Sequence, residues 1–369
     1  MGETLRALGL MSGTSMDGIS VALIDTDGED NVVRGATQIF PYNSSERKAI
    51  SIAMAEARQL KDRSCRSGSL GSTEKMITQL HAKAVQNFIV SNDLSPQQID
   101  VIGFHGQTVL HRPERSLTVQ LGNGHLLSEL TGIDVVYDLR ARDVEAGGQG
   151  APLVPVYHRA LVSRMDKRPT ALLNIGGVAN ITFIGSDSSM LAFDTGPGNA
   201  LIDDWMMRKS GNAYDAEGRT AAKGTVNNDV LRFLLSNSYF FKSPPKSLDR
   251  NAFDTDVYEW MTAQDGAATL TAFTVEAIVK SLDHLTENPK LWIVCGGGRK
   301  NLTLMKKLSA CVEGSVHPAE IFGLDGDSIE AEAWGYLAVR SLKGLPITFP
   351  GTTGVSTPLT GGVLCIPKN

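Results

Sequence analysis

The chain has 369 residues, more than one ordinary domain usually holds, so two domains are expected. Hydrophobic residues make up 42% and charged residues 20%, the proportions of a globular protein with a substantial core. The net charge is -5 with Lys and Arg spread along the chain, which argues against a nucleic-acid partner and leaves small anionic ligands bound by backbone amides open.

The cysteines and the lengths of the apolar runs indicate in which cellular compartment the protein works. Four cysteines (Cys65, Cys295, Cys311 and Cys365) lie far apart without a C-x-x-C pair, which is typical of free thiols in a reducing environment. The N-terminus has no charged leader followed by an apolar stretch suited to export. No apolar run approaches the roughly 20 residues of a membrane span. We expect a cytoplasmic protein with no membrane partner.

The first half of the chain begins with a predicted β-hairpin. An apolar strand over 5–10, a turn of small and polar residues and a second strand over 19–24 give this pattern. Helical periodicity follows over 44–92. Further strands are predicted at 101–104, 117–121 and 135–139, and the glycines at 147–150 interrupt the pattern.

The opening arrangement recurs in the second half. An apolar segment at 171–175, a small-residue turn at 176–180 and an apolar segment at 181–184 repeat it in kind. This repetition predicts a duplicated architecture with a boundary near 150–170, and hence domains over 1–160 and 161–369. The remaining pattern predicts strands at 191–194 and 291–295, helices at 200–208, 267–285, 300–312 and 327–342, a loop at 243–254 and an irregular tail at 351–367.

Three glycine-rich turns each follow a predicted strand: 12–18, Gly176-Gly177 and Gly296-Gly297-Gly298. Glycine allows backbone amides to approach a polyphosphate closely, and consecutive amides form an anion-binding concavity. Each turn alone has the alternative interpretation of an ordinary hairpin turn or helix start. Their repetition favours phosphate binding.

The familiar nucleotide-binding signatures do not occur in the sequence. There is no G-x-x-x-x-G-K-[ST] motif and no protein-kinase catalytic or metal loop. We therefore expect another scaffold, in which two similar domains each present a glycine hairpin to a nucleotide held in the cleft between them.

Two aspartates stand beside these turns. Asp17 and Asp194 lie near strand ends, where one carboxylate can hold Mg²⁺ near the phosphates and another can act as a general base. Their alternative role is turn formation.

Other polar residues carry similar alternatives. Glu330 follows Asp327 by three residues, which is close to a helix capping box. His105 can be a hydrogen-bonded structural histidine, and Arg140 and Asp143 can be solvated surface residues.

Five segments together resemble the anhydro-N-acetylmuramic acid kinase family, in order and across essentially the full chain. They are GLMSGTSMDG at 9–18, FHGQT at 104–108, Asp143 with GGQGAPLVP at 147–155, LNIGG at 173–177 and FDTGPGN at 193–199. The resemblance implies an α/β fold of the two-domain actin-like class, shared with acetate and sugar kinases and chaperone ATPases, with duplicated mixed-sheet domains and an interdomain cleft. It also implies a homodimer that uses ATP and Mg²⁺.

The resemblance further implies roles for single residues. The first phosphate loop would comprise Ser12, Gly13, Thr14, Ser15, Met16, Asp17, Gly18 and Ile19, with Asp17 near the metal. Gly176 and Gly177 would form the second phosphate hairpin, and Gly296, Gly297 and Gly298 the turn on the adenosine side. Asp194 would be the catalytic base, and Glu330, a glutamate near the sugar, would be the second catalytic residue. His105, Gln107, Thr108, Arg140 and Asp143 would lie on the sugar side.

The implied reaction converts ATP, water and 1,6-anhydro-N-acetylmuramic acid to N-acetylmuramic acid 6-phosphate and ADP, within cell-wall recycling. Two other functions remain open from the sequence. One is a plain hexosamine kinase on the same fold, and the other is a filament-forming or chaperone-like ATPase with no sugar substrate.

Overall fold

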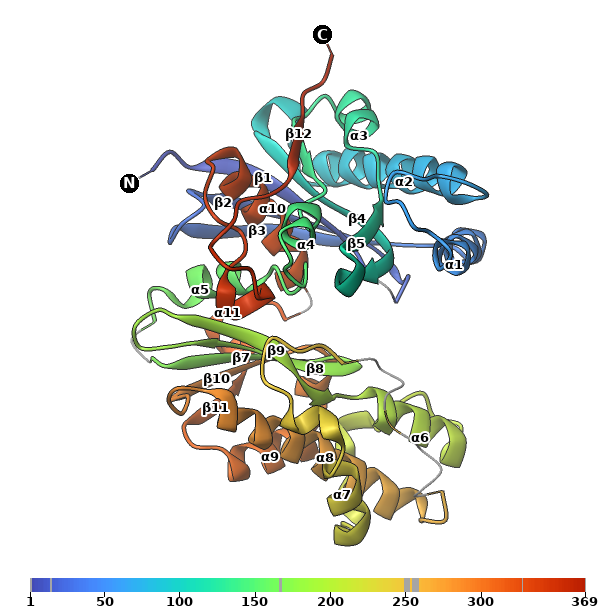
Figure 1. The fold of residues 1–369 in the computed structure, drawn as a ribbon, viewed down its shortest axis with the longest axis vertical. Coiled ribbons are helices and arrows are strands. Elements are labelled where there is room, and N and C mark those ends of the chain that lie inside the picture. Colours follow the sequence, from blue (N-terminus) through green and yellow to red (C-terminus); the bar gives the residue numbers. More distant parts are fainter. Residues whose placement is uncertain are drawn as a thin grey trace. The chain divides into compact units, whose positions relative to one another are not determined.

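A computed structural model describes residues 2–13, 15–165, 168–248, 253, 259–326 and 328–368 (Figure 1). The chain divides into two compact units. The first unit comprises residues 1–164 together with 328–369, and the second comprises residues 165–327.

This division corrects one expectation from the sequence, which placed everything after residue 160 in a single second domain. Residues 328–369 belong to the first unit instead. The physical reason is that the helix α10 (Ile329–Leu342) packs on strands β1 (Leu5–Ser12) and β4 (Val101–Arg112).

The first unit is built on a seven-stranded sheet whose main path runs β12-β6-β4-β1-β2-β3, with β5 paired to β4. Strand β1 is antiparallel to β2 and parallel to β4, and β4 is parallel to β6. The remaining strands are β2 (Gly18–Thr26), β3 (Val32–Pro41), β5 (Leu117–Leu121), β6 (Val135–Tyr137) and β12 (Val363–Cys365). The other helices are α1 (Ser44–Ala57), α2 (Leu70–Ser91), α3 (Gly124–Thr131), α4 (Ala141–Glu145), α5 (Pro155–Val162) and α11 (Pro350–Thr353).

The second unit is built on a five-stranded sheet in the order β11-β10-β7-β8-β9. Its strands are β7 (Thr170–Ile175), β8 (Val178–Ile184), β9 (Met190–Pro197), β10 (Leu291–Cys295) and β11 (Ser315–Pro318). Its helices are α6 (Ala200–Ser210), α7 (Asn228–Leu235), α8 (Ala263–Ser281) and α9 (Leu302–Cys311). Apolar side chains of α8 and α9 form one core with alternate residues of β7 and β8.

The two sheets share one topology, which confirms the predicted duplicated α/β architecture. In each unit three consecutive antiparallel strands are followed by two more strands that add in parallel beside the first. The order is β3-β2-β1-β4-β6 in the first unit and β9-β8-β7-β10-β11 in the second. Both hairpins predicted from the sequence open these sheets.

The two faces of the first sheet follow from the alternation of side chains along a strand. Leu8, Leu10 and Phe104 belong to the core that includes α1 and α2. Gly9 and Gly103, paired in register, face the opposite way. A Cβ atom on Gly9 would lie 1.8 Å from the Ala331 carbonyl oxygen, and one on Gly103 would lie 1.9 Å from the Trp334 carbonyl oxygen. The backbone of α10 can therefore cross β1 and β4 only where both residues are glycine.

A buried ion pair fixes the beginning of α10. Glu332 is fully buried and accepts hydrogen bonds from Arg34 Nη2 at 2.7 Å and Tyr157 Oη at 2.7 Å. The Ser328 hydroxyl donates to the same carboxylate at 2.9 Å. Strand β3 and helix α5 thereby hold the first turn of α10 at several points.

Some predicted boundaries were wrong. Strand β3 was missed, and the predicted helical segment 44–92 is two helices separated by a loop over 58–69. The predicted loop over 243–254 is described at 243–248 and 253, and its other residues lie outside the described part of the chain. In the part of the chain that the structure describes, no helix is both long and apolar enough for a transmembrane segment.

Candidate active site

The predicted first phosphate loop begins where β1 ends. The Ser12 hydroxyl donates to Gln107 Oε1 at 2.6 Å, and Gln107 Nε2 donates to the Gly13 carbonyl at 3.2 Å. Met16 has a φ of 57°, and its amide closes a turn on the Gly13 carbonyl at 3.1 Å. Gln107 is fully buried, and its side-chain amide binds both the Ser12 hydroxyl and the Gly13 carbonyl. These hydrogen bonds suit a role for Gln107 in fixing the conformation of the loop. Thr14 lies outside the described residues.

Asp17 lies at the end of this loop with an exposed side chain. Among the described residues, its carboxylate hydrogen-bonds to no protein group, and no cluster of three or more metal-ligating side chains occurs. A single free carboxylate fits Mg²⁺, which keeps several waters and is usually held by one or two carboxylates and substrate phosphates.

His105 and Arg140 form a pair beside the loop. His105 Nδ1 lies 3.3 Å from the Ser12 carbonyl oxygen, and Arg140 Nη2 lies 3.1 Å from His105 Nε2. The Nδ1–H tautomer satisfies both contacts. Burial, with the charge of Arg140, holds the pKa of His105 well below 6.5, so the imidazole is neutral. Burial also lowers the pKa of Arg140 to about 10, while Glu330 and Asp143 oppose that shift.

Asp143 holds the neighbouring glycine turn. It is 2% exposed and accepts hydrogen bonds from the Gly150 amide and the Thr353 hydroxyl, both at 2.6 Å. Arg140 Nη1 donates to the Gly150 carbonyl at 2.7 Å. Arg140 and Asp143 thus belong to one buried network and not to a solvated surface. Thr108 lies on β4, where its hydroxyl accepts from Gln120 Nε2 at 3.2 Å.

Glu330 is the second residue of α10. The helix begins after Ser328, whose side chain makes no capping hydrogen bond, so Glu330 is not the third residue that a capping box requires. Asp327, the cap considered from the sequence, lies outside the described residues. The exposed Glu330 is instead the first acidic neighbour that raises the pKa of Arg140.

In the second unit, two predicted glycine turns lie side by side. They follow β7 and β10, which pair in parallel with Asn174 opposite Cys295. Gly296 has a φ of 71°, and a Cβ there would lie 2.3 Å from Asn174 Oδ1. The Gly176 carbonyl accepts from the Asn199 amide at 2.7 Å. The structure therefore brings Gly176-Gly177, Gly296–Gly298 and the beginning of α6 into one cluster.

Asp194 lies on β9, partly buried. Its Oδ2 accepts from the Leu248 amide at 2.8 Å. Burial raises the pKa of Asp194 from 3.8 to about 6, although the Leu248 amide acts in the opposite direction. A carboxyl with this pKa is ionised at neutral pH and is a stronger base than an ordinary aspartate, which suits general-base catalysis.

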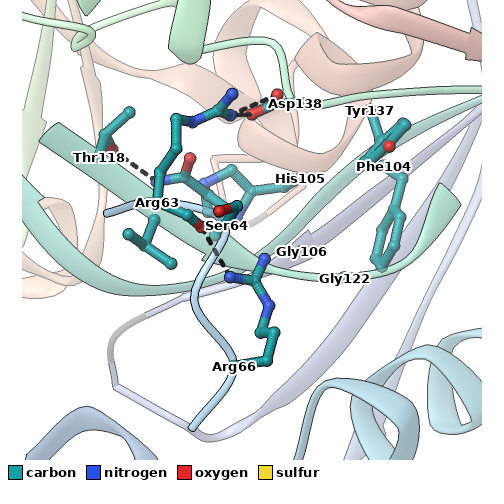
Figure 2. A pocket seen from close by; sticks show the side chains of 12 residues that line it. Arg63, Ser64, Arg66, Phe104, His105, Gly106, Thr118, Gly122, Tyr137 and Asp138 are labelled. Atoms are coloured by element: carbon teal, nitrogen blue, oxygen red, sulfur yellow. Dashed lines mark hydrogen bonds and ion pairs between the residues drawn. The ribbon is translucent and has the colours of Figure 1, made fainter. Parts of the chain in front are cut away.

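Sequence reasoning missed a pocket in the first unit. It has a volume of about 190 Å³, and Arg63, Arg66, Gln120 and Asp138 line it beside His105 (Figure 2). Both arginines lie in the loop between α1 and α2, inside the segment predicted to be helical. The run Ser67-Gly68-Ser69 was the available signal for a break before α2.

The predicted site residues thus fall into two groups. The loop at 12–19 and His105, Gln107, Thr108, Arg140, Asp143 and Glu330 belong to the first unit. Gly176, Gly177, Asp194 and Gly296–Gly298 belong to the second. The catalytic and binding roles of these residues stay predictions.

This chain is similar to known proteins over nearly its whole length. The family model described as anhydro-N-acetylmuramic acid kinase matches residues 5–367. The anhydro-N-acetylmuramic acid kinase of Methylobacterium nodulans is 50% identical, over 98% of this chain and 100% of that protein. The protein of the same name from Agrobacterium fabrum is 49% identical, over 99% of each chain.

Similar solved structures are much more distant in sequence. The activator of the 2-hydroxyisocaproyl-CoA dehydratase from Clostridium difficile with bound ADPNP is 10% identical, with a TM-score of 0.44 over 92% of this chain and 96% of that chain. A ROK family glucokinase from Streptomyces griseus in complex with glucose and AMPPNP is 11% identical, with a TM-score of 0.39 over 90% and 98% of the respective chains. The family model and the close relatives agree over nearly the whole sequence, and this chain belongs to the anhydro-N-acetylmuramic acid kinase family.

Proposed function

We propose that this protein is a kinase of cell-wall recycling that uses ATP and water to convert 1,6-anhydro-N-acetylmuramic acid to N-acetylmuramic acid 6-phosphate and ADP. The observation that carries the proposal is family membership over residues 5–367, with relatives about 50% identical and matched over their full length. Cytoplasmic location and a homodimeric state complete the proposal.

Asp194 is the proposed general base. It accepts a proton from a water molecule whose oxygen attacks the anomeric carbon. The bond from that carbon to the 6-oxygen breaks, and the 6-oxygen takes the γ-phosphoryl group while ADP leaves. One carboxylate that activates water at an anomeric centre is the arrangement of inverting glycosidases, and here phosphoryl capture replaces protonation of the departing oxygen.

The glycine turns are the proposed phosphate and nucleotide contacts. The backbone of Ser12–Ile19 and the cluster of Gly176-Gly177 and Gly296–Gly298 offer amides to an anion. Gly296, with a φ of 71°, adopts the conformation that favours glycine. Asp17 would hold Mg²⁺, which neutralises charge on the phosphates when it is bound.

His105, Arg140 and Glu330 are the proposed groups on the sugar side. Gln107 and Asp143 support them indirectly, because their polar atoms contact the loop at 12–13 and the turn at 148–150. Thr108 stays a proposed sugar contact.

The test is ATP consumption by the purified protein with and without 1,6-anhydro-N-acetylmuramic acid, followed by product analysis in ¹⁸O-water. We expect ADP formation that depends on the sugar, with label at the anomeric position. A plain hexosamine kinase would leave that position unlabelled. A filament-forming or chaperone-like ATPase would hydrolyse ATP at the same rate without sugar.

A further inference from the structure

The pocket beside His105 lies wholly within the first unit. It lies where the parallel pairing of β4 with β6 ends, at Phe104 and Tyr137, and the ends of parallel strand pairs are common ligand sites in α/β sheets. Phe104 and Tyr137 form an aromatic wall, and Arg63 and Arg66 lie on the loop across from it (Figure 2). Gln120 contributes its side chain from β5.

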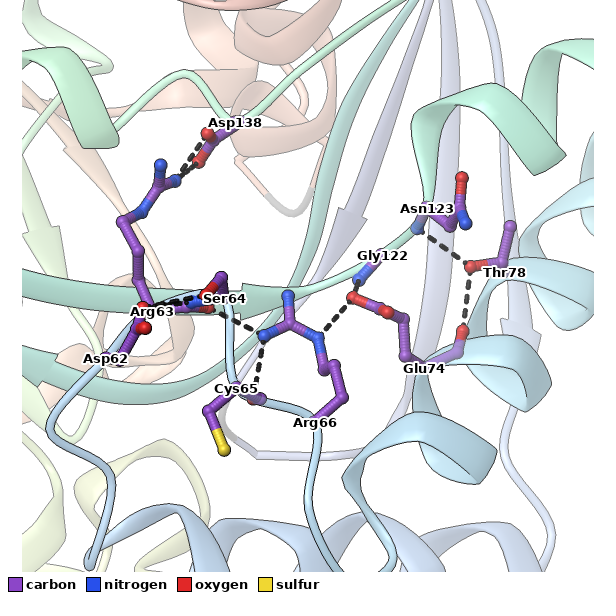
Figure 3. Close-up of polar contacts among 10 residues, drawn as sticks. All are labelled: Asp62, Arg63, Ser64, Cys65, Arg66, Glu74, Thr78, Gly122, Asn123 and Asp138. Carbon is purple, nitrogen blue, oxygen red and sulfur yellow. Dashed lines mark hydrogen bonds and ion pairs between the residues drawn. The ribbon is translucent and has the colours of Figure 1, made fainter.

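A polar network fixes the loop that carries the two arginines (Figure 3). Arg63 Nη2 binds both carboxylate oxygens of Asp138. Arg66 Nε donates to Glu74 at 2.9 Å, and Arg66 Nη1 donates to the carbonyl oxygens of Arg63 and Cys65 at 2.7 and 3.1 Å. Glu74 also accepts from the Gly122 amide at 3.2 Å. The guanidinium groups are therefore held in place before any ligand binds.

This network leaves hydrogen-bonding capacity unused in residues that line the pocket. Among the described residues, Arg66 Nη2 donates to no protein atom. The buried atoms Arg63 Nε and Gln120 Oε1 have no hydrogen-bond partner. Unpaired buried polar atoms are rare in native proteins, and a missing ligand or water is a common reason for them.

The charge of the lining residues favours an anion. Arg63 and Arg66 contribute two positive charges and Asp138 one negative charge, and His105 is neutral. Glu74 does not line the pocket but pairs with Arg66 Nε, so Arg66 Nη2 is the part of that guanidinium left for an anion. Guanidinium groups bind carboxylates through short charge-assisted hydrogen bonds. The aromatic wall suits a small apolar group next to that carboxylate.

We propose that this pocket binds the carboxylate of the lactyl ether on the sugar substrate, and that Arg66 is its specificity-determining residue. The inference rests on the proposed function, since the muramic sugar carries this substituent and the corresponding glucosamine sugar does not. His105 connects the pocket with the proposed sugar site, because it lines the pocket and also contacts Arg140 and the Ser12 carbonyl. The phosphate of a nucleotide is the competing anion, and the experiment separates the two.

The experiment compares 1,6-anhydro-N-acetylmuramic acid with 1,6-anhydro-N-acetylglucosamine in steady-state kinetics of the full chain. Arg66→Gln is expected to raise KM for the muramic sugar roughly tenfold or more, as for the loss of one charged hydrogen bond. The KM for the glucosamine sugar and the KM for ATP should change less than about twofold. Arg66→Lys should restore part of the preference, because it keeps the charge.

Gln120→Glu is the second variant, because it places a negative charge in the pocket. Gln120 Nε2 donates to the hydroxyls of Thr108 and Thr118, and in the variant these hydroxyls can rotate and donate to the carboxylate instead. This variant should raise KM for the muramic sugar and leave KM for the glucosamine sugar nearly unchanged. Lys61→Gln is the matched control, because it removes an exposed charge from the same loop outside the pocket lining. This control should leave the KM values for both sugars unchanged.

If Arg66→Gln raises KM equally for both sugars, the inference is overturned and the loop has a purely structural role. A change confined to the KM for ATP would assign the pocket to a phosphate. A wild-type protein that uses both sugars without preference would overturn the pocket's role and leave the proposed function intact. A wild-type protein that uses neither sugar would overturn the proposed function and this inference with it.

Discussion

Asp194 combines a raised pKa with a fixed orientation, since the Leu248 amide holds one of its carboxylate oxygens. A general base acts only when it is deprotonated. With a pKa of about 6, kcat should fall as the pH drops below about 6, where an ordinary aspartate with a pKa of 3.8 would still be ionised. The measurement is the pH profile of kcat, with circular dichroism as the control for folding. Undiminished kcat at pH 5 would contradict the assignment.

The substitution Asp194→Asn tests the same residue by removing its basicity at nearly constant shape. We expect kcat to fall by about 100-fold or more, the usual contribution of a general base, while ATP binding by calorimetry stays unchanged. Turnover near that of the wild type would remove Asp194 from its role.

The same substitution has an expected effect on stability. A raised pKa means that folding favours the protonated carboxyl, so this stabilising contribution is present below pH 3.8 and is lost as the pH rises through about 6. Asp194→Asn should therefore raise the free energy of unfolding by about 1–2 kcal/mol at pH 7 and by less at pH 4. Denaturant unfolding at the two pH values gives the comparison.

At the residue scale, the sequence allowed prediction of the positions that a turn or a motif marks. Asp17 and the glycine turns lie where the hairpins and strand ends were expected. Asp194 was predicted at a strand end but lies inside β9, which continues to Pro197. Arg63 and Arg66 could not be found in this way, because charged residues between two helices look like the solvent face of one longer helix. Their importance depends on partners far away in sequence, such as Asp138.

At the scale of elements, the crossing of α10 over β1 and β4 depends on two glycines. The substitution Gly103→Ala would place a Cβ 1.9 Å from the Trp334 carbonyl oxygen, and a backbone atom of a packed helix cannot move aside cheaply. We expect a loss of about 3 kcal/mol or more in the free energy of unfolding, measured with urea.

Gly71→Ala provides the matched control for this substitution. Gly71 lies in α2, and a Cβ there would lie 3.4 Å from the Arg66 carbonyl oxygen, an ordinary contact distance. Alanine favours the helical conformation over glycine, so this variant should be as stable as the wild type or slightly more stable. Equal stability of both variants would show that the α10 crossing tolerates a side chain.

The elements that were hardest to predict from the sequence were those without a regular spacing of apolar residues. Strand β3 is an edge strand with alternating half-buried and exposed residues, including Val33 and Ile39, which are 57% and 59% exposed. Its polar and apolar residues therefore gave no strong signal for burial. Helix α10 itself was predicted, but a local pattern does not reveal which sheet a helix covers.

At the scale of the whole molecule, the return of residues 328–369 to the first unit makes a further prediction. A chain that ends after residue 327 lacks α10, the partner of Gly9 and Gly103, and also lacks Glu332, the buried partner of Arg34 and Tyr157. We expect this truncated chain to aggregate or to lose its cooperative thermal transition.

The control for the truncation removes only residues 366–369, which follow the last strand. That shorter deletion should leave a soluble protein with a far-ultraviolet circular dichroism spectrum like that of the full chain. A monodisperse chain of residues 1–327 with a cooperative transition would contradict the role assigned to α10.

The insertion of residues 165–327 between the two parts of the first unit also affects synthesis on the ribosome. The first unit is begun first but cannot be completed until residues 328–342 have emerged, because until then one face of its sheet lacks its helix. The second unit is one continuous segment and is fully translated earlier. During translation the glycine-bearing face of β1 and β4 therefore stays uncovered until after the second unit has been made, and surface exposed at that stage favours misassociation of nascent chains.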